Sequence, residues 1–196
     1  MGSDLCRIFG RNFDWTTHIA LLLFTHPQDD YASISMVDLT YLGFTYKNQP
    51  DPKQDEDALL QTAFLPIDGM NEYGLTISLM LISHAEPPYS PSKNTIYTSN
   101  VIRLVLDYAK NIDEAISLIS NYNIDFQNSK CHFLLAEPSS RSVILKFLNN
   151  KIVINNTDAK WQVCTNFIIQ GSDVPDNVYC WRYKLAYKKL KNMLRF

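Results

Sequence analysis

Two adjacent amphipathic helices fall between two groups of short strands in the hydrophobic pattern, and this order most restricts the fold. The apolar residues of 101–110 lie on one helical stripe. A second helix is predicted to begin at Asn111 or Asp113 and to end within 121–123. Strands, a helix pair, more strands and a closing helix together favour an α+β fold, with helices layered on mainly antiparallel sheets.

The expected strands are short, and they either alternate in polarity or are apolar on both faces. We predict strands over 7–15, 18–25, 31–37, 76–82, 131–136, 142–147, 151–155 and 161–167. Helices are predicted over 56–64 and 179–194 as well, with surface loops over 39–57 and 84–95 and a connection over 66–69.

Composition bounds the class of protein. The chain has 196 residues, 46% of them hydrophobic, which predicts one domain over 1–196 with a real core. Its net charge of -2, with acids and bases mixed, gives no reason to expect a nucleic acid or an anionic membrane as a partner. The longest apolar run, 19–24, is too short to span a bilayer, and no signal peptide is visible, so we expect a cytoplasmic location.

Cysteine and histidine spacings do not match a metal centre. The four cysteines, which lack any CxxC spacing, are Cys6, Cys131, Cys164 and Cys180. The four histidines, none of which forms an i, i+4 pair, are His18, His26, His84 and His132. We therefore predict no metal and no cofactor, and we interpret Cys131 and Cys164 as small buried hydrophobic residues.

The stretch GRNFDW, residues 10–15, places a cation, an amide and a carboxylate within four positions of an otherwise apolar segment. On a strand, Arg11 and Phe13 would share one face, while Asn12 and Asp14 would share the other. Burial of a guanidinium or a carboxylate is costly unless the group is paired. The cluster therefore indicates either a private ion pair or a working site.

Three further motifs follow in order: 68–75 (DGMNEYGL), 132–147 with its central turn, and 164–167 (CTNF) ahead of Arg182 and Tyr183. Together with GRNFDW, this order resembles the linear amide C–N hydrolases of the N-terminal nucleophile superfamily. That group includes choloylglycine hydrolases, penicillin V acylases, acid ceramidase-like amidases and acyl-CoA:6-aminopenicillanate acyltransferases. The resemblance covers almost the whole chain.

The resemblance implies a four-layer αββα sandwich. Family members carry their nucleophile on a strand that precedes the GRN stretch, and they continue past the helix bearing Arg-Tyr. We therefore expect this sequence to be a partial domain, truncated at both ends. Exposed strand edges are a hazard for a monomer, so three alternatives remain open. The sequence is a fragment, partner segments complete its sheets (as in a homo-oligomer), or the protein is a degenerate family member.

The family mechanism assigns a role to each candidate residue. An N-terminal cysteine attacks the amide, and its free α-amine carries the proton. Arg11 would hold the thiolate, Asp14 would orient the amine, Asn166 would donate to the oxyanion, and Arg182 would brace the group or meet substrate. Cys6 is the nucleophile candidate, although it lies roughly 16 Å from Arg11 along one strand and gains a free amine only if 1–5 are removed.

The resemblance thus implies a hydrolase that cleaves the linear amide bond of an N-acyl substrate through a cysteine acyl-enzyme. The aromatic loops 39–46 and 87–97 would line its acyl pocket, and a backbone N–H of 79–81 would be the second oxyanion donor. A catalytically silent relative that binds an acyl ligand or a protein partner is the alternative. A processing peptidase that uses Ser3 or Cys6 is a third.

Overall fold

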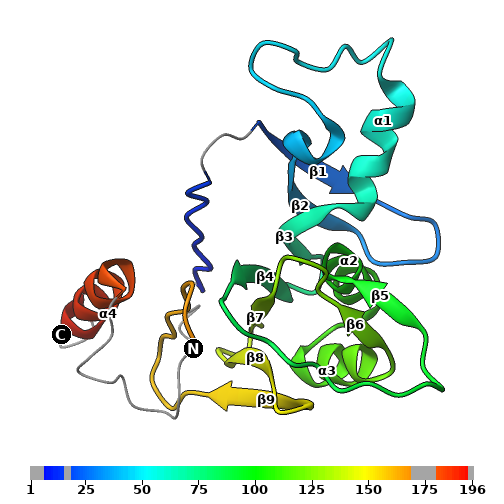
Figure 1. Cartoon of the computed structure of the whole chain (residues 1–196). Coiled ribbons are helices and arrows are strands. Elements are labelled where there is room, and N and C mark those ends of the chain that lie inside the picture. The colour runs from blue at the N-terminus through cyan, green and yellow to red at the C-terminus, as the bar shows by residue number, and fades with distance from the viewer. Residues whose placement is uncertain (1–6, 16–18, 169–179, 194–196) are drawn as a thin grey trace.

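One antiparallel sheet forms the centre of the molecule in the computed structural model, which describes residues 7–15, 19–168 and 180–193 (Figure 1). Within these residues the sheet has seven strands in the order β1-β2-β3-β4-β7-β8-β9, each pair antiparallel. The strands are β1 (Ala20–Thr25), β2 (Ser33–Asp38), β3 (Pro66–Asn71), β4 (Thr76–Leu81), β7 (Cys131–Ala136), β8 (Ser142–Leu148) and β9 (Lys151–Asn156).

The helices and a small second sheet complete the described part of the chain. The helices are α1 (Glu56–Leu60), α2 (Thr98–Tyr108), α3 (Ile112–Ser120) and α4 (Trp181–Met193), with 3-10 turns η1 (Leu39–Leu42) and η2 (Gln61–Phe64). Strands β5 (Thr95–Tyr97) and β6 (Asn123–Asp125) pair in parallel. None of these helices is long and apolar enough to cross a bilayer.

The main core lies between the sheet and the pair α2 and α3. Side chains alternate along a strand, so Phe133 and Leu135 of β7 enter this core while His132 and Leu134 face the opposite side. Asn71 joins the two layers, because its Nδ2 donates to the carbonyl oxygens of Leu106 and Ala109 at the end of α2. The α2–α3 pair is thereby fixed to one face of the sheet.

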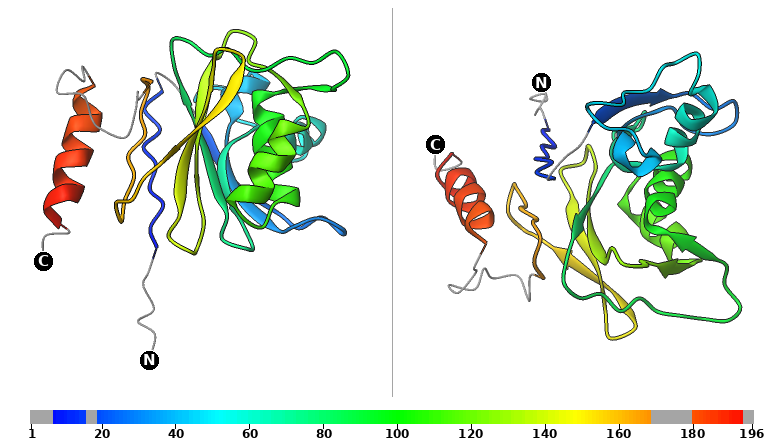
Figure 2. Two further views of the ribbon diagram at one scale, coloured as in Figure 1. Left: turned by 90° about the horizontal axis from the view of Figure 1, so that it is seen from below. Right: turned by 45° about the horizontal axis from the view of Figure 1, so that its top comes forward.

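The opposite face of the sheet carries two further layers. The segments 7–15 and 157–168 lie between the sheet and α4, as the left view in Figure 2 shows. Helix α4 packs against the second segment through edge-to-face contacts of Trp161 with Tyr187 and of Phe167 with Tyr183. The order is thus helices, sheet, extended segments, helix, which confirms the predicted α+β class and matches the layer order of an αββα sandwich.

Three element predictions were wrong, and two strands were missed. Segments 7–15 and 161–167 are extended but pair with no strand among the described residues, while 66–69 is part of β3, and β5 and β6 were not predicted. The β3 sequence PIDGMN has low strand propensity, but its position between β2 and β4 overrides local preference. Segment 7–15 is held through its side chains, which periodicity does not reveal.

Gly69 is required where β3 passes under α2. A Cβ at this position would lie 2.7 Å from the Ile34 carbonyl oxygen and 2.7 Å from Leu106 Cδ1. We expect Gly69→Ala to lower the free energy of unfolding by about 1–3 kcal/mol in urea denaturation, because the backbone oxygen cannot move aside freely. Gly10→Ala is the matched control, since a Cβ there meets nothing within 4 Å. Equal stability of the two variants would contradict this packing.

Candidate active site

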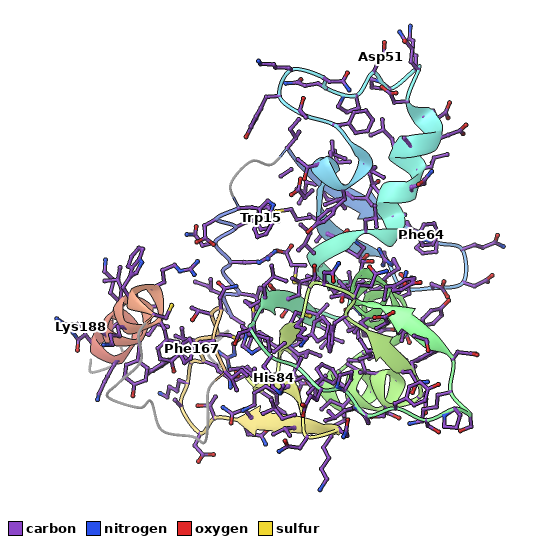
Figure 3. The ribbon with its side chains drawn as sticks, in the orientation of Figure 1. Trp15, Asp51, Phe64, His84, Phe167 and Lys188 are labelled. Carbon is purple, nitrogen blue, oxygen red and sulfur yellow. The ribbon has the colours of Figure 1, made fainter. Side chains whose placement is uncertain are left out.

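A cavity of about 690 Å³ lies between the sheet, the two extended segments and α4. Its lining is drawn from both ends of the chain and from β4 in the middle. Trp15 and Phe167, labelled in Figure 3, come from the two segments that separate α4 from the sheet. The predicted site residues Arg11, Asp14, Asn166 and Arg182 all line this cavity.

Arg11 enters the cavity from the first segment and is paired. Its Nη1 donates to Asp68 Oδ2 at 2.7 Å, and its Nη2 donates to the Leu79 carbonyl oxygen at 3.2 Å. The guanidinium also lies 5.0 Å from the centre of the Phe13 ring. The side chains of Arg11 and Asp68 are only 16% and 17% exposed, so this ion pair is largely shielded from water.

Asp14, Arg182 and Asn166 form a continuous chain of hydrogen bonds. Arg182 Nη1 donates to Asp14 Oδ2, and its Nη2 donates to Asn166 Oδ1 at 3.1 Å. Asn166 in turn donates through Nδ2 to the Leu81 carbonyl oxygen at 2.9 Å. Arginine can only donate hydrogen bonds, so the Asn166 atom in contact with Arg182 must be the oxygen Oδ1. The nitrogen Nδ2 therefore faces β4.

Strand β4 offers these carbonyl oxygens because β3 pairs with it only over 76–78. Residues two apart on a strand direct their carbonyl groups to the same side, so the Leu79 and Leu81 carbonyls share one orientation. Arg11 bonds the first carbonyl and Asn166 bonds the second. The part of β4 that β3 leaves unpaired therefore anchors both segment 7–15 and the turn that carries Asn166.

Asn166 sits at the tip of a three-residue turn, closed by a hydrogen bond of 3.0 Å from Phe167 N to the Thr165 carbonyl oxygen. His132 Nε2 lies 2.8 Å from the same oxygen and 3.2 Å from Cys164 Sγ. Burial lowers the pKa of His132 to about 4, against the opposing effect of the Thr165 carbonyl, and the charge of Lys146 lowers it further. His132 is therefore neutral at pH 7.

Among the described residues, two cysteines lie beside Thr165: Cys164 precedes it in the chain, and Cys180 accepts a hydrogen bond from its hydroxyl. Cys164 lines the cavity, and burial raises the pKa of its thiol. Burial also raises the pKa of Cys180, but hydrogen bonds from Thr165, Tyr183 N and Arg182 outweigh it and lower that pKa below the usual value. Cys131 is buried in the core on the far face of the sheet. The nucleophile candidate, Cys6, lies outside the described residues.

Histidine, cysteine and acidic side chains do not gather into a metal centre in this part of the chain. Among the described residues, no group of three or more of them could hold a metal ion.

The outcome for the predicted site residues is mixed. The structure brings four of them together, but their catalytic roles remain predictions. The loop 39–46 supplies Tyr41 to the cavity lining. The loop 87–97 supplies no lining residue, so the expectation for this second loop was wrong. Sequence reasoning also missed Asp68 and His132. Asp68 opens the DGMNEYGL motif, and His132 interrupts an apolar strand, and both were visible signals.

This layered arrangement is the N-terminal nucleophile hydrolase fold. The sequence profile of the acyl-coenzyme A:6-aminopenicillanic acid acyl-transferase family matches residues 60–179, more than half of the chain. The chain belongs to this family.

Solved structures share the fold. Penicillin V acylase from Agrobacterium tumefaciens superposes with a TM-score of 0.58 at 19% identity, over 94% of this chain and 52% of that one. An arginine-to-leucine variant of conjugated bile acid hydrolase from Clostridium perfringens gives 0.52 at 16% identity, over 94% and 52%. The chain thus spans about half the length of these relatives. A search of curated proteins finds no match.

We expect the Arg11–Asp68 pair to contribute more to stability than an exposed ion pair does. A double-mutant cycle with Arg11→Ala and Asp68→Ala should give a coupling energy of about 1–3 kcal/mol, because each charge alone would be left shielded without its counter-ion. The matched control is the exposed pair Arg141–Asp113, for which about 0.2–1 kcal/mol is expected. Equal coupling in the two cycles would contradict the shielded pairing.

The depressed pKa of His132 makes stability depend on pH. The unfolded chain binds a proton near pH 6.5, whereas the folded protein resists it down to about pH 4, so stability falls as the pH drops through this window. We expect His132 alone to account for a loss of up to about 3 kcal/mol. Denaturation at several pH values should show a shallower slope in His132→Gln than in the wild type. An equal dependence of stability on pH in the two proteins would contradict the burial of a neutral His132.

Proposed function

We propose that the chain carries the site of a hydrolase that cleaves the linear amide bond of an N-acyl substrate through a cysteine acyl-enzyme. The supporting observation is the convergence of Asp14, Arg182 and Asn166, with Arg11 beside them, on one cavity. Asp14 and Arg182 are separated by 168 positions in the sequence, so local structure does not explain their contact. Charged and hydrogen-bonding groups fixed around one cavity suit a reaction in which charge develops on the substrate.

The apolar part of the cavity suits an acyl group. Aromatic and aliphatic side chains supply most of its wall, among them Phe9, Phe13, Met80, Leu134, Trp181 and Leu185. The polar groups that bond one another lie on segment 7–15, on β4, at the turn that carries Asn166 and at the start of α4. An N-acyl substrate would place its chain along the apolar wall and its amide at the polar edge.

Asn166 is arranged to stabilise an oxyanion. Its Oδ1 is occupied by Arg182, and one hydrogen of Nδ2 is used on the Leu81 carbonyl. An amide nitrogen carries two hydrogens, so one remains to donate to the carbonyl oxygen of the substrate as that oxygen becomes negative. The contacts with Arg182 and Leu81 hold this donor in place before substrate binds.

Arg11 and Asp14 serve the nucleophile in this proposal. Arg11 donates one N–H to Asp68 and one to the Leu79 carbonyl oxygen. A guanidinium carries five N–H donors, and those that bond no other described residue would hold the thiolate. The sulfur attacks the carbonyl carbon, a C–S bond forms, and the C–N bond then breaks as the amine takes up the proton that the α-amine had removed from the thiol. Water next hydrolyses the thioester; an amine in its place would give acyl transfer.

The sharpest test measures amine release from a panel of fatty N-acyl amides. We expect Asn166→Ala to lower kcat by about 10²–10³ with a small effect on KM, since the donor acts on charge that exists only in the transition state. A merely structural Asn166 would instead lower the folded fraction and leave kcat per folded molecule unchanged.

The thiol requirement is tested with Cys6→Ser against Cys131→Ser, because Cys131 is buried on the far face of the sheet. Loss of the acyl-enzyme mass after incubation with an N-acyl ester probe is expected for the first variant alone. Thermal stabilisation by acyl amides without turnover in the wild type would reject the hydrolase and favour the catalytically silent alternative.

A further inference from the structure

We propose that His132 is the positioning residue that fixes Asn166 in the site, an inference that rests on the oxyanion role proposed for Asn166. His132 belongs to β7 and is 0% exposed, yet it lies on the cavity side of the sheet and reaches the turn at 164–166. It does not line the cavity itself. Its effect would therefore act through the turn.

The hydrogen-bond geometry determines the tautomer of His132. A carbonyl oxygen can only accept, so the 2.8 Å contact with the Thr165 oxygen requires the proton on Nε2. Cys164 Sγ, at 3.2 Å from the same nitrogen, shares this donor. Nδ1 then carries the lone pair, and it is buried without a partner among the described residues.

The same carbonyl oxygen closes the turn around Asn166. Thr165 O accepts from Phe167 N at 3.0 Å and from His132 Nε2, which uses both of its lone pairs. The first bond shapes the turn, and the second ties it to β7, beside the strand whose Leu81 carbonyl holds the Asn166 amide. These bonds together fix the position of Asn166 relative to two adjacent strands of the sheet, β4 and β7.

A purely structural imidazole does not account for this arrangement. An apolar side chain on this face would pack in the sheet without leaving Nδ1 buried and unpaired. The feature that only the imidazole adds is the donor to Thr165. What this donor controls is the position of the turn, and hence of the Asn166 amide one residue later.

The tautomer is tested first, on the wild type. A long-range proton–nitrogen NMR correlation of the ¹⁵N-labelled chain should show His132 protonated at Nε2 and unprotonated at Nδ1. Protonation at Nδ1 would overturn the proposal outright, since Nε2 could not then donate to Thr165. This measurement needs no variant and no substrate.

The second test follows the Asn166 side-chain amide in three variants. His132→Leu removes the donor and should move the Asn166 amide signals, whereas His132→Gln keeps an N–H and should return them toward their wild-type positions. Phe133→Leu is the matched control, because Phe133 is buried on the same strand but on the opposite face. Unmoved Asn166 signals in folded His132→Leu, or an equal movement in Phe133→Leu, would refute the positioning role.

Kinetics separate this proposal from the proposed function. With an active wild type, His132→Leu should lower kcat by about ten- to a hundredfold with KM little changed, while His132→Gln recovers part of the loss. Absence of turnover in the wild type would reject the hydrolase and leave the NMR result on His132 standing. An equal fall of kcat in Phe133→Leu would reject the positioning role.

Discussion

The candidate site depends on the part of β4 that β3 leaves unpaired, which begins after Ser78. Because β3 pairs with β4 only up to Ser78, the carbonyl groups of Leu79 and Leu81 are left to accept from side chains. Arg11 and Asn166 donate to them, which brings the two ends of the chain to one strand. A full β3–β4 ladder would satisfy these carbonyls with backbone donors and would leave no anchor for either side chain.

Charge pairing then decides which groups are free to do chemistry. Arg11 is neutralised by Asp68, and Arg182 by Asp14, so neither cation is left shielded and alone. Both arginines keep further N–H donors after these bonds, because a guanidinium carries five. The pairing thus fixes both side chains and still leaves N–H donors, which the proposed reaction would use.

Sequence pattern predicted the parts of this structure that follow from local physics. The helix pair and strands β4, β7, β8 and β9 were found from hydrophobic periodicity, and the GRNFDW stretch gave Arg11 and Asp14. Strand β3 was missed because its residues form a strand only when β2 and β4 supply partners. The hydrogen bond between His132 and the Thr165 carbonyl joins positions 33 apart, and no local pattern encodes a contact of that kind.

The same long-range contacts link the site to the stability of the fold. The bonds of Arg11 to Asp68, Asn166 to Leu81 and Arg182 to Asp14 span 57, 85 and 168 positions. Each of them closes a long loop, which costs chain entropy that only the complete packing offsets. We therefore expect the polar cluster to assemble last, after the sheet has paired and α4 has docked. A change that loosens α4 should then disturb the cluster before it disturbs the α2–α3 core on the other face.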